Sequence, residues 1–85
     1  MKNLKMFAIY GTATNTSEEI KLDEISIVAD TNTLKVIGNF FTNAAKEMEA
    51  HELEHMHFQD MVDNFSHENH VDIIVLNKDV ILTKK

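Results

Sequence analysis

The string with the clearest chemical potential is His51-Glu52-Leu53-Glu54-His55, a match to the pattern His-Glu-x-x-His. On a helix, this pattern places two histidines on one turn to bind zinc, while the first glutamate polarises the attacking water. Charged residues surround the histidines, with Glu49 before them and Glu54 between them, which is typical of a solvated face. His57 lies about 240° around such a helix from His51 and cannot supply a third ligand. A small zinc-dependent hydrolase is therefore only the alternative hypothesis.

An extended backbone over the same residues gives a different arrangement. The sequence alternates from Leu53 to Gln59, and in a strand His55 and His57 would share one face because successive side chains point to opposite sides. Periodicity alone leaves helix and strand open here. In the strand, the two histidines could bind a metal together with His67 or His70. The stronger interpretation of histidines clustered among acids is a polar surface, so we expect no metal and no cofactor.

Charge is concentrated around these histidines. The chain of 85 residues has a formal net charge of −6, yet the segment from Glu47 to Asp72 holds eight acids, no Lys and all five His. That segment is −8, whereas the remaining six acids and eight Lys give +2. Such a segment is either a solvated face or a negative surface that steers and binds a basic partner.

Composition excludes several other classes of function. There is no Cys for a disulfide or thiolate site, and no Arg to read phosphates, so a nucleic-acid partner is not expected. Gly11 and Gly38 are the only glycines, too few for a phosphate-binding loop, and no serine lies in a Gly-x-Ser-x-Gly setting. Apolar runs such as Ile73 to Leu76 are far shorter than the roughly 20 residues that span a bilayer. We expect a single cytoplasmic domain over residues 1–85, with no membrane association.

The elements that position the acidic segment follow from periodicity. Lys5 to Ala13 and Ile20 to Val28 are rich in β-branched and aromatic residues and predict a hairpin, with Glu24 to Ala29 as the core part of its second strand. Apolar residues then recur with a helical period, which predicts an amphipathic helix over Thr31 to Ala50.

The C-terminal residues predict a second hairpin. Val71 to Leu76 is a short apolar run, Asn77-Lys78-Asp79 is turn-forming, and Val80 to Thr83 is predicted as the last strand. The predicted fold class is α+β, with a mostly antiparallel sheet of about five strands. The long helix would pack on one face of this sheet, which leaves the opposite face or an edge free for a partner.

The order of these elements resembles the immunity protein 32 family of bacterial polymorphic toxin systems. The resemblance covers roughly residues 22 to 77 and is carried by the helix with its paired alanines Ala44-Ala45, the string His55-Met56-His57-Phe58-Gln59-Asp60, and the strand Val71-Asp72-Ile73-Ile74-Val75. The chain departs from the family pattern at Val71, where a proline would be expected before Asp72, and at Met61-Val62, where an aromatic would be expected. The resemblance also favours a strand from about Leu53 to Gln59.

The resemblance implies an immunity protein that binds and neutralises a cognate toxin without catalysis. The toxin would be basic at its contact surface, because carboxylates pair with Lys or Arg and histidines supply hydrogen bonds near neutral pH. A dimeric structural or regulatory domain is a further alternative. A homodimer is compatible with this alternative and with toxin binding. The expected partner-binding residues are Glu54, His55, His57, Asp60, Asp63 and Asp72.

Overall fold

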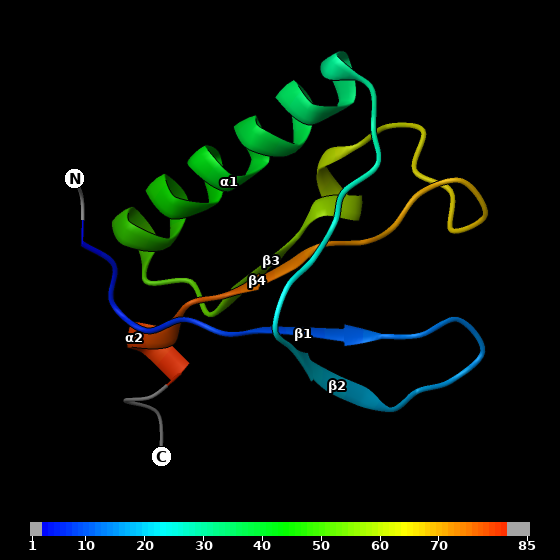
Figure 1. Ribbon diagram of the computed structural model, residues 1–85. Coiled ribbons are helices and arrows are strands. Elements are labelled where there is room, and N and C mark those ends of the chain that lie inside the picture. Colours follow the sequence, from blue (N-terminus) through cyan, green and yellow to red (C-terminus); the bar gives the residue numbers. More distant parts are fainter. Residues whose placement is uncertain (1–2, 82–85) are drawn as a thin grey trace.

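In the part of the chain that the structure describes, four strands form two separate sheets. The computed structural model describes residues 3–81 and has an α+β architecture. Its elements are β1 (Ile9–Thr12), β2 (Glu19–Leu22), α1 (Thr31–His51), β3 (His55–His57), the 3₁₀ helix η1 (Phe58–Met61), β4 (Ile74–Leu76) and α2 (Lys78–Ile81). β1 pairs with β2 and β3 with β4, both antiparallel, so the expected single sheet of about five strands is wrong. Figure 1 shows α1 on one side of β3–β4 and the β1–β2 hairpin on the other.

The long helix α1 confirms the prediction from periodicity and extends it by one residue, to His51. Asp30 precedes it with an extended backbone and forms no capping hydrogen bond to the helix backbone through its side chain. The Thr33 side chain nonetheless stabilises the carboxylate and lowers the pKa of Asp30 below its ordinary value. The helix ends because Glu52 adopts the left-handed conformation, with φ of 53° and ψ of 41°.

A small aromatic core joins α1 to the second sheet. Ile37 and Phe40 from α1 meet Phe58 from η1, and the rings of Phe40 and Phe58 lie edge to face with centroids 5.3 Å apart. Partly buried apolar residues pack around this cluster: Met56, Val62, Phe65, Ile73 and Val75. The helix therefore packs on β3–β4 and η1 through Ile37 and Phe40, whereas Leu34 and Phe41 of the predicted apolar stripe are 45% and 43% exposed.

Strand β3 is shorter than the predicted strand from Leu53 to Gln59. Only His55–His57 is extended, and the chain then enters η1, which carries Phe58 under Phe40. Phe58 follows Met56 by two residues, so strand alternation already turns its ring toward the helix, where it is buried. The backbone N–H of Phe58 still donates to the carbonyl of Ile73, at 2.7 Å, and so continues the ladder with the segment before β4.

The N-terminal hairpin is confirmed, but its predicted core part is wrong. β1 and β2 pair from Ile9 opposite Leu22 to Thr12 opposite Glu19. The strand ends at Leu22, so none of the predicted range from Glu24 to Ala29 lies in a strand. Asp23-Glu24 interrupts the alternation of apolar residues, and the chain beyond it has no partner strand within the described residues.

The predicted last strand, from Val80 to Thr83, is wrong for its described part. Residues Lys78–Ile81 form the short helix α2, and Thr83 lies outside the described residues. Asn77 explains the helix, because its side-chain oxygen accepts from the N–H of Asp79 at 3.1 Å and its carbonyl accepts from the N–H of Ile81 at 3.0 Å. Across residues 3–81, no helix combines the length and the apolar character that crossing a membrane requires.

Candidate functional site

The centre of the candidate site is a contact between the end of β3 and the residue two places before β4. His57 Nδ1 lies 3.0 Å from Asp72 Oδ2, and the other carboxylate oxygen, Asp72 Oδ1, accepts from the backbone N–H of Gln59 at 2.9 Å. The side chains of His57 and Asp72 are 31% and 17% exposed. Both oxygens of one carboxylate are therefore occupied, and they hold the imidazole and the first turn of η1 in place.

This contact determines what the imidazole can offer to a ligand. Because a carboxylate only accepts hydrogen bonds, Nδ1 of His57 carries a proton and donates a hydrogen bond to Asp72. In the neutral ring, Nε2 is then an acceptor, and in the protonated ring it is a second donor. The orientation of the ring is fixed by the protein, so Nε2 is presented in a defined direction.

The face around His57 combines polar and apolar groups. Met56 and Val75 are paired and pack on the core, so alternation turns the neighbouring side chains of both strands to the opposite side. We call this side the outward face; it consists of His55, His57, Asp72, Ile74 and Leu76. The rings of His55 and His57 lie 5.3 Å apart, nearly perpendicular. Ile74 and Leu76 are 51% and 60% exposed, so the described residues leave about half of each side chain uncovered.

The structure brings together only part of the predicted binding set. His55, His57 and Asp72 share the outward face, whereas Asp60 lies exposed in the first turn of η1 and Asp63 lies exposed just after it. Glu54 is half-buried where the chain enters β3, and its carbonyl accepts from the N–H of Asn77 at 2.7 Å. Glu54, Asp60 and Asp63 therefore flank the outward face along the chain.

The prediction missed the two apolar members of this face. Ile74 and Leu76 alternate with the core residues Ile73 and Val75 in the sequence, so a period of two already separates them from the core. Residues 73–76 are all hydrophobic, which is equally typical of a strand buried on both faces, so the sequence did not distinguish core-facing from outward-facing residues.

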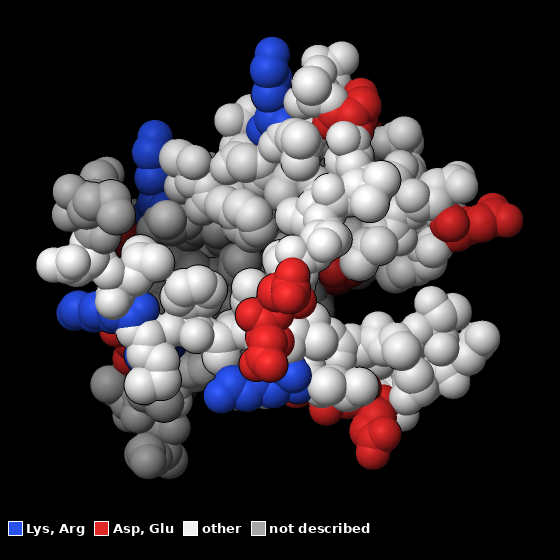
Figure 2. Space-filling view, in the orientation of Figure 1, with Lys and Arg blue, Asp and Glu red and all other residues white. Residues whose placement is uncertain are grey.

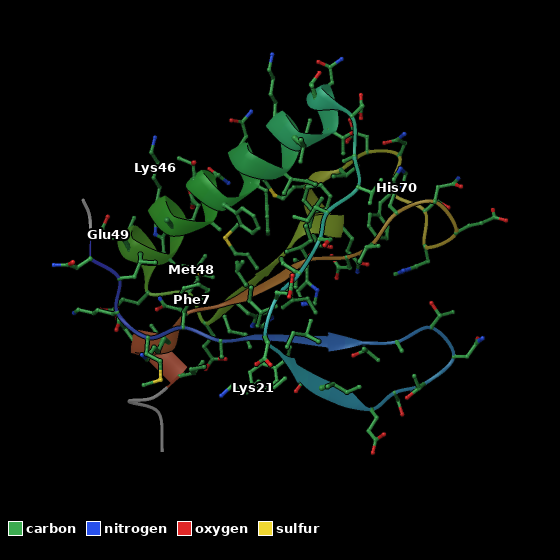
Figure 3. All side chains as sticks on the ribbon, in the orientation of Figure 1. Phe7, Lys21, Lys46, Met48, Glu49 and His70 are labelled. Carbon is green, nitrogen blue, oxygen red and sulfur yellow. The ribbon has the colours of Figure 1, made fainter. Side chains whose placement is uncertain are left out.

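The histidines of the following loop do not join His57. His70 Nδ1 accepts from the backbone N–H of Ser66 at 3.0 Å, and its ring centroid lies 5.6 Å from that of Phe65. His67 contacts the same phenyl ring at 4.9 Å. Figure 3 shows His70 in this loop, beyond the end of η1. Within residues 3–81, no group of three or more His, Cys, Asp or Glu side chains is placed to hold a metal ion.

The helical zinc arrangement considered for His51 to His55 does not form. His51 is the last residue of α1 and lies 3.6 Å from Glu47, one helical turn earlier. Glu52 ends the helix in the left-handed conformation, and His55 is the first residue of β3. The two histidines thus lie on different elements, and the strand interpretation is confirmed for His55–His57.

The acidic segment is spread over several elements. Its carboxylates come from the end of α1, from η1 and from the loop before β4. Figure 2 shows the Asp and Glu side chains of the whole described chain at several places on the face in view, the central ones beside a Lys side chain. The charge of the segment is therefore dispersed over these elements, and it acts at long range as a field.

Comparison of the chain with protein-family models, with curated proteins and with solved structures finds no match.

Proposed function

We propose that the protein is a non-catalytic immunity protein that binds and neutralises a cognate bacterial toxin in the cytoplasm. The observation that carries the proposal is the outward face, where the oriented imidazole of His57 lies beside the half-exposed side chains of Ile74 and Leu76. Protein interfaces typically combine an apolar centre with a few oriented polar groups.

The Asp72 carboxylate prepares His57 for binding. An interface residue that is mobile in the free protein loses about 0.5–1.5 kcal/mol of conformational entropy when a partner immobilises it. Here the hydrogen bond from Nδ1 to Asp72 already restricts the ring, which reduces that cost. Asp72 thus acts as a positioning residue, and the contacts with the toxin come from His55, His57, Ile74 and Leu76.

The acidic residues around this face favour a partner with a positively charged surface. Asp60 and Asp63 are exposed, and exposed charges at the rim of an interface mainly accelerate association and make it sensitive to salt. Glu54 adds a third carboxylate at the start of β3. The preferred toxin surface is therefore basic around an apolar patch that receives Leu76.

The resemblance to the immunity protein 32 family supports the same face. Its most distinctive string, residues 55–60, forms β3 and most of η1, and its strand string contains Asp72. The hydrogen bonds of Asp72 to His57 and to the Gln59 backbone connect these two strings.

The test uses the product of a toxin gene next to the gene for this chain, and the absence of such a gene would count against the proposal. We expect the full chain to bind that toxin and to restore growth of cells that express it. Leu76→Glu should weaken binding at least tenfold, about 1.4 kcal/mol, because it places a charge in the apolar centre. Val36→Glu is the matched control, since Val36 is 49% exposed on α1 and away from the outward face. Failure of the parent chain to bind, or equal losses in both variants, would contradict the proposal.

A further inference from the structure

The N-terminal hairpin and the segments that flank it expose an unusual amount of apolar surface. Ten large apolar or aromatic side chains between Leu4 and Val28 are each at least 36% exposed, and Val28 is 99% exposed. We call these side chains the hairpin surface. An isolated two-stranded hairpin is marginally stable in water, and monomeric proteins rarely expose apolar patches larger than a few hundred Å². A partner that covers the hairpin surface would resolve both problems.

One edge of the hairpin is available for further strand pairing. Among residues 3–81, β2 pairs with β1 and with no other strand. Figure 1 shows β2 as the outer strand of the hairpin, on the side away from α1, and Figure 3 shows Lys21 projecting from this side. An edge strand presents backbone N–H and C=O groups that can pair with another strand.

The sequence of β2 is complementary to itself. When two copies of the strand run antiparallel with Ile20 opposite Ile20, Glu19 of each copy lies opposite Lys21 of the other. The two-fold symmetry repeats this oppositely charged pair, so the single register forms two pairs of Glu19 with Lys21. A shift by one residue would place Ile20 opposite Lys21 and lose both charge pairs.

We propose that the protein forms a homodimer in which β2 pairs with β2 of a second copy in this register. The two hairpins then form one antiparallel four-stranded sheet. In the β1–β2 pairing, Ile9 lies opposite Leu22 and Gly11 opposite Ile20, so these apolar residues share one face. The dimer doubles this face and brings the two Ile20 side chains together at its centre.

The face that the dimer doubles carries three exposed apolar side chains per copy. Ile9, Ile20 and Leu22 are 37%, 53% and 36% exposed, so the paired hairpins bring six such side chains onto one sheet. The dimer uses β2, whereas the proposed toxin contact uses the outward face of β3–β4. The two proposals are therefore independent, and either can fail alone.

Analytical ultracentrifugation of the full, untagged chain tests the dimer. We expect a concentration-dependent species of twice 9.7 kDa. Glu19→Lys and Lys21→Glu should each weaken self-association at least tenfold, because each places like charges opposite one another twice. An equimolar mixture of these two variants should associate again, since the chains are then oppositely charged at both positions, and the double variant carrying both substitutions should also dimerise.

Matched controls distinguish the effect of the charge pairs on self-association from the effect of net charge. Glu49→Lys and Lys35→Glu make the same changes at exposed positions on α1 and should leave self-association unchanged. Circular dichroism of each variant verifies that it is folded, and the mixture provides a gain of association that misfolding cannot produce. A parent chain that stays monomeric at millimolar concentration would overturn the proposal. The proposal would also be overturned if the charge variants dimerised as strongly as the parent, or if their mixture failed to associate.

Discussion

His57 and Asp72 are separated by 15 positions in the sequence, yet Nδ1 of the imidazole lies 3.0 Å from Oδ2 of the carboxylate. Asp72 also accepts from the backbone of Gln59. One side chain therefore fixes the direction of His57, the start of η1 and the approach to β4. The same contact contributes to stability and prepares the proposed binding face.

Replacement of Asp72 should destabilise the protein. Asp72→Ala leaves the half-buried His57 ring and the N–H of Gln59 without their acceptor, so we expect a loss of about 1–3 kcal/mol in the free energy of unfolding. Urea denaturation measures this change. Asp63→Ala, which removes an exposed carboxylate from the same acidic segment, should change stability by less than about 0.5 kcal/mol. Equal stabilities of the two variants would show that the Asp72 hydrogen bonds contribute nothing.

The aromatic core should be sensitive to the loss of one ring. Phe58→Ala removes the partner of Phe40 from the buried cluster and should cost about 3–4 kcal/mol, a large part of the stability of a small domain. Thermal unfolding followed by circular dichroism measures the loss. Phe41→Ala, at a position 43% exposed on the same helix, should cost less than half as much. A reversed order would mean that α1 packs through its other face.

The end of α1 can be stabilised by a single substitution. Glu52 has a positive φ, which costs a residue with a Cβ atom about 1–2 kcal/mol. Glu52→Gly removes that cost but adds freedom to the unfolded chain, so we expect a net gain of about 0.5–1 kcal/mol. The midpoint of urea denaturation should rise. A lower midpoint would indicate that the Glu52 side chain makes a stabilising contact that outweighs its backbone conformation.

Acid should weaken the start of α1 through Asp30. Because the pKa of Asp30 is lowered in the folded protein, its contribution to stability is complete above the ordinary pKa of aspartate. The contribution is lost as the pH falls through the lower, folded-state pKa. Asp30→Asn keeps an N-cap side chain without a titratable charge. The difference in melting temperature between parent and variant should therefore shrink between about pH 5 and about pH 2. A difference that is constant over this range would contradict the role of the charge.

The elements that local patterns determine were predictable from the sequence. The 3.6-residue period located α1 to within one residue, and the two β-rich runs located the N-terminal hairpin. Other elements depend on contacts that no local period contains. β3 ends where Phe58 packs against Phe40 and η1 begins. Asn77 starts α2 in place of the predicted last strand by accepting backbone hydrogen bonds.

In the candidate site too, local patterns identify residues but long-range contacts determine how they are arranged. His57 and Asp72 were both selected because they are polar residues of the acidic segment, but their pairing depends on the register between β3 and β4. A one-residue shift of either strand would turn one of them toward the core. Ile74 and Leu76 join the face through the same register, which is why the sequence alone did not assign them to it.

An NMR titration tests most directly whether the outward face binds a toxin. The ¹⁵N-labelled chain would be titrated with its unlabelled cognate toxin. We predict that the largest shift changes fall on His55, His57, Ile74 and Leu76, with few changes on α1. Changes confined to the hairpin surface, or no changes at saturating toxin, would contradict toxin binding by the outward face.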